Sequence, residues 1–251
     1  MKNSELLELA KDAAVLAGKE ILKVYNQDFN VEYKQDNSPL TIADKNANAV
    51  IESFLVKSDI PILSEEGREI PYNERKNWEK LWIVDPLDGT KEFIKRNGEF
   101  TVNIALIEAG VPVMGVIYVP VKKVLYFASS AGAYKEENNQ QIKLPLLSNR
   151  EKFVAVGSRS HQSEQTKDYF KSLADKHGDI EIVSMGSSLK ICLVAEGAAD
   201  VYPRFAPTME WDTAAGHAIA LHSGKTLVDQ KTNKEMSYNR EQLLNNWFIV
   251  S

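Results

Sequence analysis

The sequence predicts an α+β fold, in which helices and strands occupy separate stretches of the chain before they alternate. Apolar residues recur at helical spacing in two segments that precede residue 57. Three strand patterns follow one another between residues 100 and 128, and short strands alternate with helices after residue 150. Separate helical and strand-rich stretches are typical of α+β proteins.

The two opening helices are predicted by apolar residues three or four positions apart. In the first helix these residues are Leu6, Leu9, Ala13, Leu16, Ala17 and Val24. In the second, which we expect from residue 41 to about residue 56, they are Ala43, Ala47, Val50, Ile51 and Phe54. Two short strands follow, at residues 60–64 and 81–84, and acidic residues come directly after each of them.

The rest of the chain divides into a strand meander and an alternating part. Strand patterns at residues 100–107, 111–119 and 124–128 predict an antiparallel meander, and polar residues 135–141 predict an exposed hairpin tip or loop. Strands are then expected at residues 153–156, 180–183 and 199–202, alternating with helices at 163–176, 187–195 and 212–222. We expect two subdomains, residues 1–150 and 151–251, that pack as one rigid unit.

Composition and charge exclude some classes of function. The 251 residues carry a formal net charge of -5, so non-specific binding of nucleic acid through a basic surface is not expected. The N-terminus lacks the pattern of a signal peptide, no run of 18 apolar residues occurs, and the simplest location is the cytoplasm. The single cysteine, Cys192, lies in an apolar run and is expected in the core.

The segment Asp85-Pro86-Leu87-Asp88-Gly89-Thr90 is the first candidate for chemistry. Asp85 follows an apolar strand, where Pro86 removes an amide donor and is expected to end the strand pairing. A turn can bring Asp88 towards the same point, and a helix starting near Thr90 would offer free amides to a phosphate. Carboxylates in this arrangement suit Mg²⁺, whereas the alternative is a turn followed by a helix cap.

Three more acidic segments have both a functional and a structural interpretation. Glu65 follows a short strand and is otherwise part of a solvated loop. Asp212 opens a predicted helix, where a capping residue is common, and Asp44 lies in the first turn of the second helix. Each structural interpretation is sufficient by itself, so the argument for a metal site depends on their combination.

The combination resembles the inositol monophosphatase superfamily of magnesium-dependent, lithium-sensitive phosphatases. The matching motifs are Thr41-x-x-Asp44, Glu65-Glu66, the segment 85–90 and Trp211-Asp212-x-x-Ala215-Gly216. The resemblance covers essentially the whole chain. It implies a layered αβαβα sandwich with an antiparallel N-terminal sheet, a mixed C-terminal αβ part, and the metal site between the two parts.

The resemblance also implies roles for individual residues. The expected metal ligands are the carboxylates of Glu65, Asp85, Asp88 and Asp212 and the backbone carbonyl of Leu87. Asp44 and Thr90 are expected to position and activate the attacking water. Two or three Mg²⁺ ions would offset the charge of the five carboxylates and attract a phosphate.

The residues that follow Thr90 narrow the substrate. Lys91-Glu92-Phe93 is typical of the bisphosphate nucleotidases, which remove the 3′-phosphate of 3′-phosphoadenosine 5′-phosphate to give AMP and phosphate. A substrate with two phosphates needs cationic donors away from the metal ions. By resemblance, the substrate contacts are Gly89, Thr90, Lys91, His161, Ser187, Lys190, Arg204 and Asp212. The structural alternatives for His161, Ser187 and Arg204 are an exposed loop, a helix cap and a solvated side chain.

Other functions would draw on the same acidic residues. Inositol monophosphatase or fructose-1,6-bisphosphatase activity would use the same metal site, and a non-catalytic phosphate sensor would be expected to lack one of the five acids. The resemblance leaves open a homodimer and attachment to the cytoplasmic face of a membrane. The expected partner is a small-molecule nucleotide bisphosphate substrate, and binding of nucleic acid is not expected.

We predict that Asp88→Asn nearly abolishes phosphate release and leaves the fold intact, because the substitution removes the charge of a metal ligand without changing its size. Phosphate release and circular dichroism of the variant test this. Near-normal turnover would show that Asp88 is not a metal ligand.

Overall fold

The computed structural model describes residues 1–26, 31–33, 39–147, 150–158 and 163–251. Its helices are α1 (Asn3–Tyr25), α2 (Ile42–Leu55), the 3-10 turn η1 (Val56–Ser58), α3 (Tyr72–Arg75), α4 (Thr90–Ile94), α5 (Glu164–His177), α6 (Leu189–Ala195) and α7 (Glu210–His222). Strands β1 (Val31–Tyr33) and β2 (Pro39–Thr41) form a small antiparallel pair.

One large sheet contains seven strands in sequence order: β3 (Ile62–Ser64), β4 (Lys80–Asp88), β5 (Thr101–Glu108), β6 (Val111–Val119), β7 (Val124–Ser129), β8 (Gly132–Glu137) and β9 (Gln140–Lys143). The expected antiparallel meander is confirmed, although β3 and β4 pair in parallel. Strands β10 (Val154–Ser158) and β11 (Glu181–Met185) form a parallel pair. A last sheet, in the order β12-β15-β13-β14, contains β12 (Tyr202–Arg204), β13 (Leu227–Asp229), β14 (Lys234–Glu235) and β15 (Phe248–Val250).

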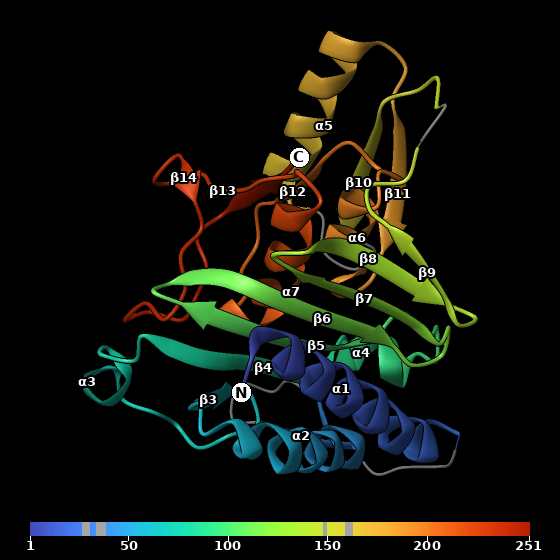
Figure 1. Cartoon of the computed structure of the whole chain (residues 1–251). Coiled ribbons are helices and arrows are strands. Elements are labelled where there is room, and N and C mark those ends of the chain that lie inside the picture. The colour runs from blue at the N-terminus through green and yellow to red at the C-terminus, as the bar shows by residue number, and fades with distance from the viewer. Residues whose placement is uncertain (27–30, 34–38, 148–149, 159–162) are drawn as a thin grey trace.

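The elements stack in five layers (Figure 1). Helices α1 and α2 cover one face of the seven-stranded sheet, and α6 and α7 lie on its other face. The two small sheets follow, and α5 packs outside them. The expected αβαβα sandwich is therefore confirmed. The predicted boundary near residue 150 falls between β9 and β10 and stays a prediction.

The side chains of β4 point alternately into two hydrophobic cores. Leu81 and Ile83 belong to the core beneath α6 and α7, whereas Trp82 and Val84 belong to the core beneath α1 and α2. Successive side chains of a strand point to opposite faces, so an entirely apolar strand can be buried on both sides. The end of β4 is thereby held rigidly where its acidic residues begin.

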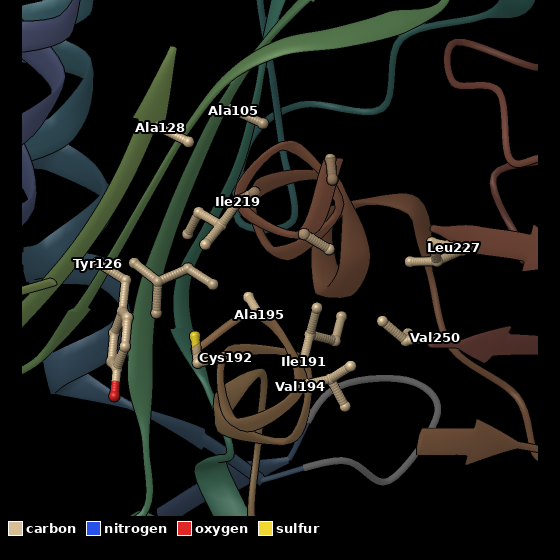
Figure 2. Close-up of a cluster of buried hydrophobic side chains, with 14 of the residues drawn as sticks. Ala105, Tyr126, Ala128, Ile191, Cys192, Val194, Ala195, Ile219, Leu227 and Val250 are labelled. Atoms are coloured by element: carbon tan, nitrogen blue, oxygen red, sulfur yellow. The ribbon is translucent and has the colours of Figure 1, made fainter. Parts of the chain in front are cut away.

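Helix α6 is the centre of the middle layer (Figure 2). Figure 2 shows Cys192 on the side of α6 that faces Tyr126 of the large sheet, while Ile191 and Val194 lie towards Val250 of the small one. Cys192 is 1% exposed, which confirms the expectation that it is a core residue. The core between the large sheet and the last sheet is continuous through this helix.

Several local predictions were wrong in detail. Residues 135–141, expected to be an exposed hairpin tip or loop, do contain a hairpin tip, but β8 and β9 extend into this stretch, so only Asn138 and Asn139 form the tip, with positive φ angles of 52° and 61°. Polar residues are compatible with these strands because they end the sheet, where side chains meet solvent. The strand expected at residues 199–202 lies at Tyr202–Arg204, because residue 201 makes only an isolated bridge to Ala155.

Pro86 does not end β4. The strand continues to Asp88, which pairs with Thr101, and the register shifts between Asp85 and Asp88. The intervening residues form a bulge, a place where a proline without an amide donor is tolerated. The bulge keeps both aspartates on one strand while changing the direction of the chain between them.

No helix in the described part of the chain is long and apolar enough to cross a membrane.

We predict that Gly115→Ala destabilises the protein. A Cβ atom at Gly115 of β6 would lie 2.3 Å from the carbonyl oxygen of Ala215 and 2.8 Å from the Cβ of Ala218, both in α7. Overpacking of this kind costs about 1–3 kcal/mol in the free energy of unfolding. The melting temperature should fall by several degrees, at roughly 2–4 °C per kcal/mol. An unchanged melting temperature would contradict this close contact between β6 and α7.

Candidate metal and substrate site

Three acidic side chains from distant parts of the sequence meet at one end of the large sheet. Glu65 follows β3, Asp85 lies in β4, and Asp212 lies in the first turn of α7. One carboxylate oxygen from each residue lies within 4.8 Å of the other two. Asp85 is buried, and the other two are half-buried. The sequence prediction that these acids gather in space is therefore correct, while their binding of metal stays a prediction.

The parallel pairing of β3 and β4 places Glu65 beside Asp85. Parallel strands end at the same edge of a sheet, so the residues that follow them are neighbours. The backbone N–H of Glu65 donates to the carbonyl oxygen of Val84 at 3.1 Å. Asp85 is itself held, because its Oδ1 accepts a hydrogen bond from the backbone N–H of Leu87 at 3.0 Å.

Asp212 lies in the first turn of α7, where acids commonly cap a helix, and it also belongs to the acidic group with Glu65 and Asp85. Its Oδ2 accepts a hydrogen bond from the backbone N–H of Met209 at 2.7 Å, as an acid in the first turn of a helix commonly does. The other carboxylate oxygen is left for the cluster. The structural and functional interpretations of this residue are therefore compatible.

A buried network fixes the start of α7. Glu210, which is fully buried, accepts hydrogen bonds from the backbone N–H of Asn239 at 2.7 Å and from the Nε of Arg240 at 3.0 Å. Charge-assisted hydrogen bonds of this kind are among the stronger ones in proteins. Because Glu210 precedes Asp212 by two residues, the network also fixes the position of Asp212.

Two further acids surround this cluster. Asp44, in the first turn of α2, is 2% exposed, and its charge contributes to raising the pKa of Asp85. Asp88 directs its Oδ2 to Ser188, whose backbone N–H and hydroxyl both donate to it at 2.6 Å. Asp44 and Asp88 therefore affect the electrostatics of Asp85, although neither belongs to the group of three acids whose oxygens lie within 4.8 Å of one another.

Their proximity has an electrostatic cost. Burial, followed by the charges of Glu65 and Asp88, raises the pKa of Asp85 well above its ordinary value. Burial, followed by the charge of Asp88, raises the pKa of Asp212 to about 8. Each carboxylate resists ionisation because its neighbours are also negative and water is partly excluded. A bound cation would reverse both effects.

The donor set fits a hard divalent cation. Carboxylate oxygens are the ligands that Mg²⁺ and Ca²⁺ prefer, and two oxygens on opposite sides of one Mg²⁺ are about 4 Å apart. Oxygens within 4.8 Å of one another can therefore bind a common ion after small shifts or share neighbouring ions. No histidine or cysteine belongs to the acidic group formed by the described residues, and this also favours a hard cation over zinc.

A cavity of about 150 Å³ opens next to the acids. Its walls include two of the acids, Asp88 and Asp212, and two cationic side chains, Lys190 and Arg204. It brings together five of the predicted substrate contacts: Gly89, Ser187, Lys190, Arg204 and Asp212. Lys91 lines a second cavity of about 520 Å³, which shares Arg204 and Asp212 with the first. Thr90 begins α4 between Gly89 and Lys91, and His161 lies outside the described residues.

The two cationic side chains differ in their surroundings. Lys190 is 7% exposed, donates to the carbonyl oxygen of Ser187 at 2.5 Å, and has its pKa lowered to about 8 by burial. Arg204 donates one Nη2 hydrogen bond to the carbonyl of Pro207, while its buried Nε has no hydrogen-bond partner. An unsatisfied buried donor on a cation is costly, and an anionic ligand would satisfy it.

Only glycine fits the backbone conformation and the space at position 89. Its φ angle is 91°, and a Cβ atom there would lie 3.2 Å from the Cβ of Ser187 and 3.3 Å from the carbonyl oxygen of Glu99. Gly186 is even more confined, since a Cβ atom would lie 2.7 Å from the Cγ of Glu92. Both glycines therefore allow the loop after β4 to pack against the turn before α6, which closes one wall of the cavity.

Sequence reasoning missed three residues at this site. Ser188 binds Asp88, Asn103 donates to the Ser188 hydroxyl at 2.8 Å, and Tyr202 lines the cavity. The only signal for Ser188 was its neighbour Ser187, which was expected to contact the substrate or cap the helix. The structure begins α6 at Leu189 after Ser188, so Ser187 is not the cap. Asn103 had no signal beyond being a polar residue in an apolar strand.

Comparison with known proteins agrees with the motifs. The model of the inositol monophosphatase family matches residues 2–248. The chain belongs to the inositol monophosphatase family.

The names of individual relatives state a more particular activity than the family name does. The 3′(2′),5′-bisphosphate nucleotidase CysQ of Salmonella typhimurium is 48% identical to the chain, and the match covers 98% of this chain and 99% of that protein. CysQ of Escherichia coli strain K12 is 46% identical over 98% of both proteins. The crystal structure of CysQ from Bacteroides thetaiotaomicron superimposes with a TM-score of 0.92 at 53% identity, covering 98% of this chain and 97% of that one. The inositol monophosphatase of Thermotoga maritima, 24% identical with a TM-score of 0.78, shares the fold.

We predict that the metal-free protein loses stability as the pH rises from about 4 to about 8. The unfolded chain releases the proton of Asp212 near pH 3.8, whereas the folded, metal-free protein keeps it until about pH 8. Between these values the folded state binds more protons, so raising the pH favours unfolding.

Melting temperatures in the presence of a chelator, at several pH values, test this prediction. A divalent cation added at pH 8 should restore stability, because it binds the ionised carboxylates of the folded protein. Asp212→Asn serves as the control and should flatten the pH dependence. A chelated wild type whose stability rises over this range would contradict the assignment.

Proposed function

We propose that the protein is a magnesium-dependent 3′(2′),5′-bisphosphate nucleotidase. It would convert 3′-phosphoadenosine 5′-phosphate to AMP and phosphate. The observation that carries this proposal is one cavity lined both by acids, Asp88 and Asp212, and by two cationic side chains, Lys190 and Arg204. A phosphate to be cleaved would bind to the acids through cations, and a second phosphate would bind the two basic side chains. Relatives named as bisphosphate nucleotidases, at 46–48% identity, support this substrate.

Residues of the chain would have separate roles in the reaction. Glu65, Asp85, Asp88, Asp212 and the carbonyl of Leu87 would hold the metal ions. When bound, magnesium supplies positive charge that offsets the carboxylates, attracts the phosphate and increases the acidity of a water molecule. Asp44 and Thr90 would orient this water for in-line attack on phosphorus. A bond would form between the water oxygen and phosphorus while the bond between phosphorus and the 3′-oxygen breaks, and a proton released by the water would end on the 3′-oxygen, which leaves as the hydroxyl of AMP.

The charge of the site favours two to three ions. The five carboxylates contribute a formal charge of about -5 when ionised, and two or three Mg²⁺ ions contribute about +4 to +6. The raised pKa values of Asp85 and Asp212 reflect how strongly the bare acids interact. Charge of this size would have to be offset before a phosphate could approach, and this supports the proposal of two to three ions.

Two properties predicted from the sequence belong to the same proposal, namely inhibition by lithium and a cytoplasmic location. The resemblance also allows assembly as a homodimer. Lithium inhibition can be measured in phosphate-release assays, and sedimentation of the purified protein measures its oligomeric state.

The discriminating experiment is a panel of phosphate-release assays. The substrates are 3′-phosphoadenosine 5′-phosphate, inositol 1-phosphate and fructose 1,6-bisphosphate, each with and without Mg²⁺ and Li⁺. The proposal requires the nucleotide to have the highest kcat/KM and activity to depend on Mg²⁺. A preference for inositol 1-phosphate or the sugar bisphosphate would instead support the alternative function at the same acids.

We predict that Arg204→Ala weakens use of the nucleotide more than use of inositol 1-phosphate. The substitution removes one of the two cationic side chains that line the cavity and would bind the second phosphate. A hydrogen bond to a charged group is worth about 1.5–3 kcal/mol, so kcat/KM for the nucleotide should fall about tenfold to hundredfold. Arg68→Ala, at an exposed arginine paired with Glu74, is the control and should change neither substrate. Equal losses on both substrates would remove Arg204 from substrate selection.

A further inference from the structure

Ser188 occupies the cap position of α6 but does not cap it. Serine at this position ordinarily accepts a hydrogen bond from a free amide of the first turn. The Ser188 side chain makes no such bond. Its backbone N–H and its hydroxyl instead lie 2.6 Å from the same carboxylate oxygen, Oδ2 of Asp88. The Ser188 side chain therefore binds Asp88 and does not cap α6.

The Ser188 hydroxyl also reaches the third segment of the site. Its oxygen lies 3.0 Å from the backbone carbonyl oxygen of Asp212. The hydroxyl has one proton and two acceptors within reach. These acceptors belong to Asp88 of β4 and Asp212 of α7, so the hydroxyl lies between these two elements. Helix α7 also packs against the large sheet, and Ser188, in the turn before α6, adds a polar connection at the acidic group.

Asn103 supports this arrangement from the large sheet. Its Nδ2 donates to the Ser188 hydroxyl oxygen at 2.8 Å and lies 3.5 Å from Oδ2 of Asp88. Asn103 is 1% exposed and Ser188 is 3% exposed. Since the Asn103 donor occupies a lone pair of the hydroxyl oxygen, the hydroxyl proton is directed to its two acceptors.

We infer that Ser188 is a positioning residue for the metal centre, an inference that rests on the proposed function. Ser188 binds Oδ2 of Asp88 and leaves Oδ1 available to a cation. Without this restraint, the Asp88 side chain could rotate away from Asp85 and Asp212, whose charges repel it. Two short hydrogen bonds to a carboxylate are enough to hold one rotamer against this repulsion. Groups that orient metal ligands in this manner typically change metal affinity by about tenfold to hundredfold.

The same turn also contacts a cationic side chain of the cavity. Ser187 precedes Ser188, and its carbonyl oxygen accepts the hydrogen bond from the buried ammonium of Lys190. The turn before α6 therefore contacts both Asp88 and Lys190, which line the same cavity.

The test measures binding of Mg²⁺ to the substrate-free protein by calorimetry. Ser188→Ala should raise the Kd about tenfold, and Ser188→Thr, which keeps the hydroxyl, should restore most of the affinity. Ser223→Ala is the matched control, since that buried hydroxyl donates to the carbonyl of Ala220 far from the acids. Its Kd should equal that of the wild type. The Mg²⁺ concentration for half-maximal phosphate release should rise with the Kd in Ser188→Ala.

A second variant guards against a folding defect in Ser188→Ala. Asn103→Ala removes the donor behind the hydroxyl and should raise the Kd for Mg²⁺ in the same direction by a smaller factor. A Kd unchanged in both variants, or equally poor in Ser188→Thr and Ser188→Ala, would overturn the inference. If the wild type itself bound no Mg²⁺ or released no phosphate, the proposed function would be wrong instead, so the two failures are distinguishable.

Discussion

Repulsion among crowded carboxylates is the constraint on which the rest of this structure depends. Oxygens of Glu65, Asp85 and Asp212 lie within 4.8 Å of one another, although ionisation of one carboxylate disfavours ionisation of its neighbours. A flexible chain would move such groups apart. Here a strand end, a β-bulge and the first turn of a helix hold them, and buried hydrogen bonds fix their directions. The fold therefore holds these carboxylates in an electrostatically unfavourable arrangement, and a bound cation would remove the repulsion.

The layered fold as a whole stabilises this crowded arrangement. Helix α7 packs against β6 so closely that Gly115 leaves no room for a side chain, and this contact places Asp212 opposite the end of β4. The apolar core around α6 is shared by the large sheet and the last sheet, so both walls of the cavity belong to one packed unit. Burial of this apolar surface outweighs the local cost of the acids.

The sequence predicted the layers and the acidic centre well because both are carried by local patterns. Helical periodicity defines α1 and α2, and an acid after each of two strands marks Glu65 and Asp85. The bulge in β4 was missed because a proline marks an interruption of strand pairing without indicating whether the strand resumes beyond it. Ser188 and Asn103 could not be found, since they lie 85 residues apart and their roles exist only in tertiary contact. The last sheet was missed because strands of two or three residues are too short to show a period.

The position of Cys192 has a consequence for the chemistry of the chain in an oxidising environment. This thiol is the protein's only one, is 1% exposed, and its pKa is raised well above the ordinary value, first by burial and then by the charge of Glu196. Peroxides and disulfides react with the accessible thiolate, which is scarce here. The chain thus has no accessible sulfur nucleophile at cysteine. Oxidants that inactivate thiol-dependent enzymes should leave its carboxylate centre in working order.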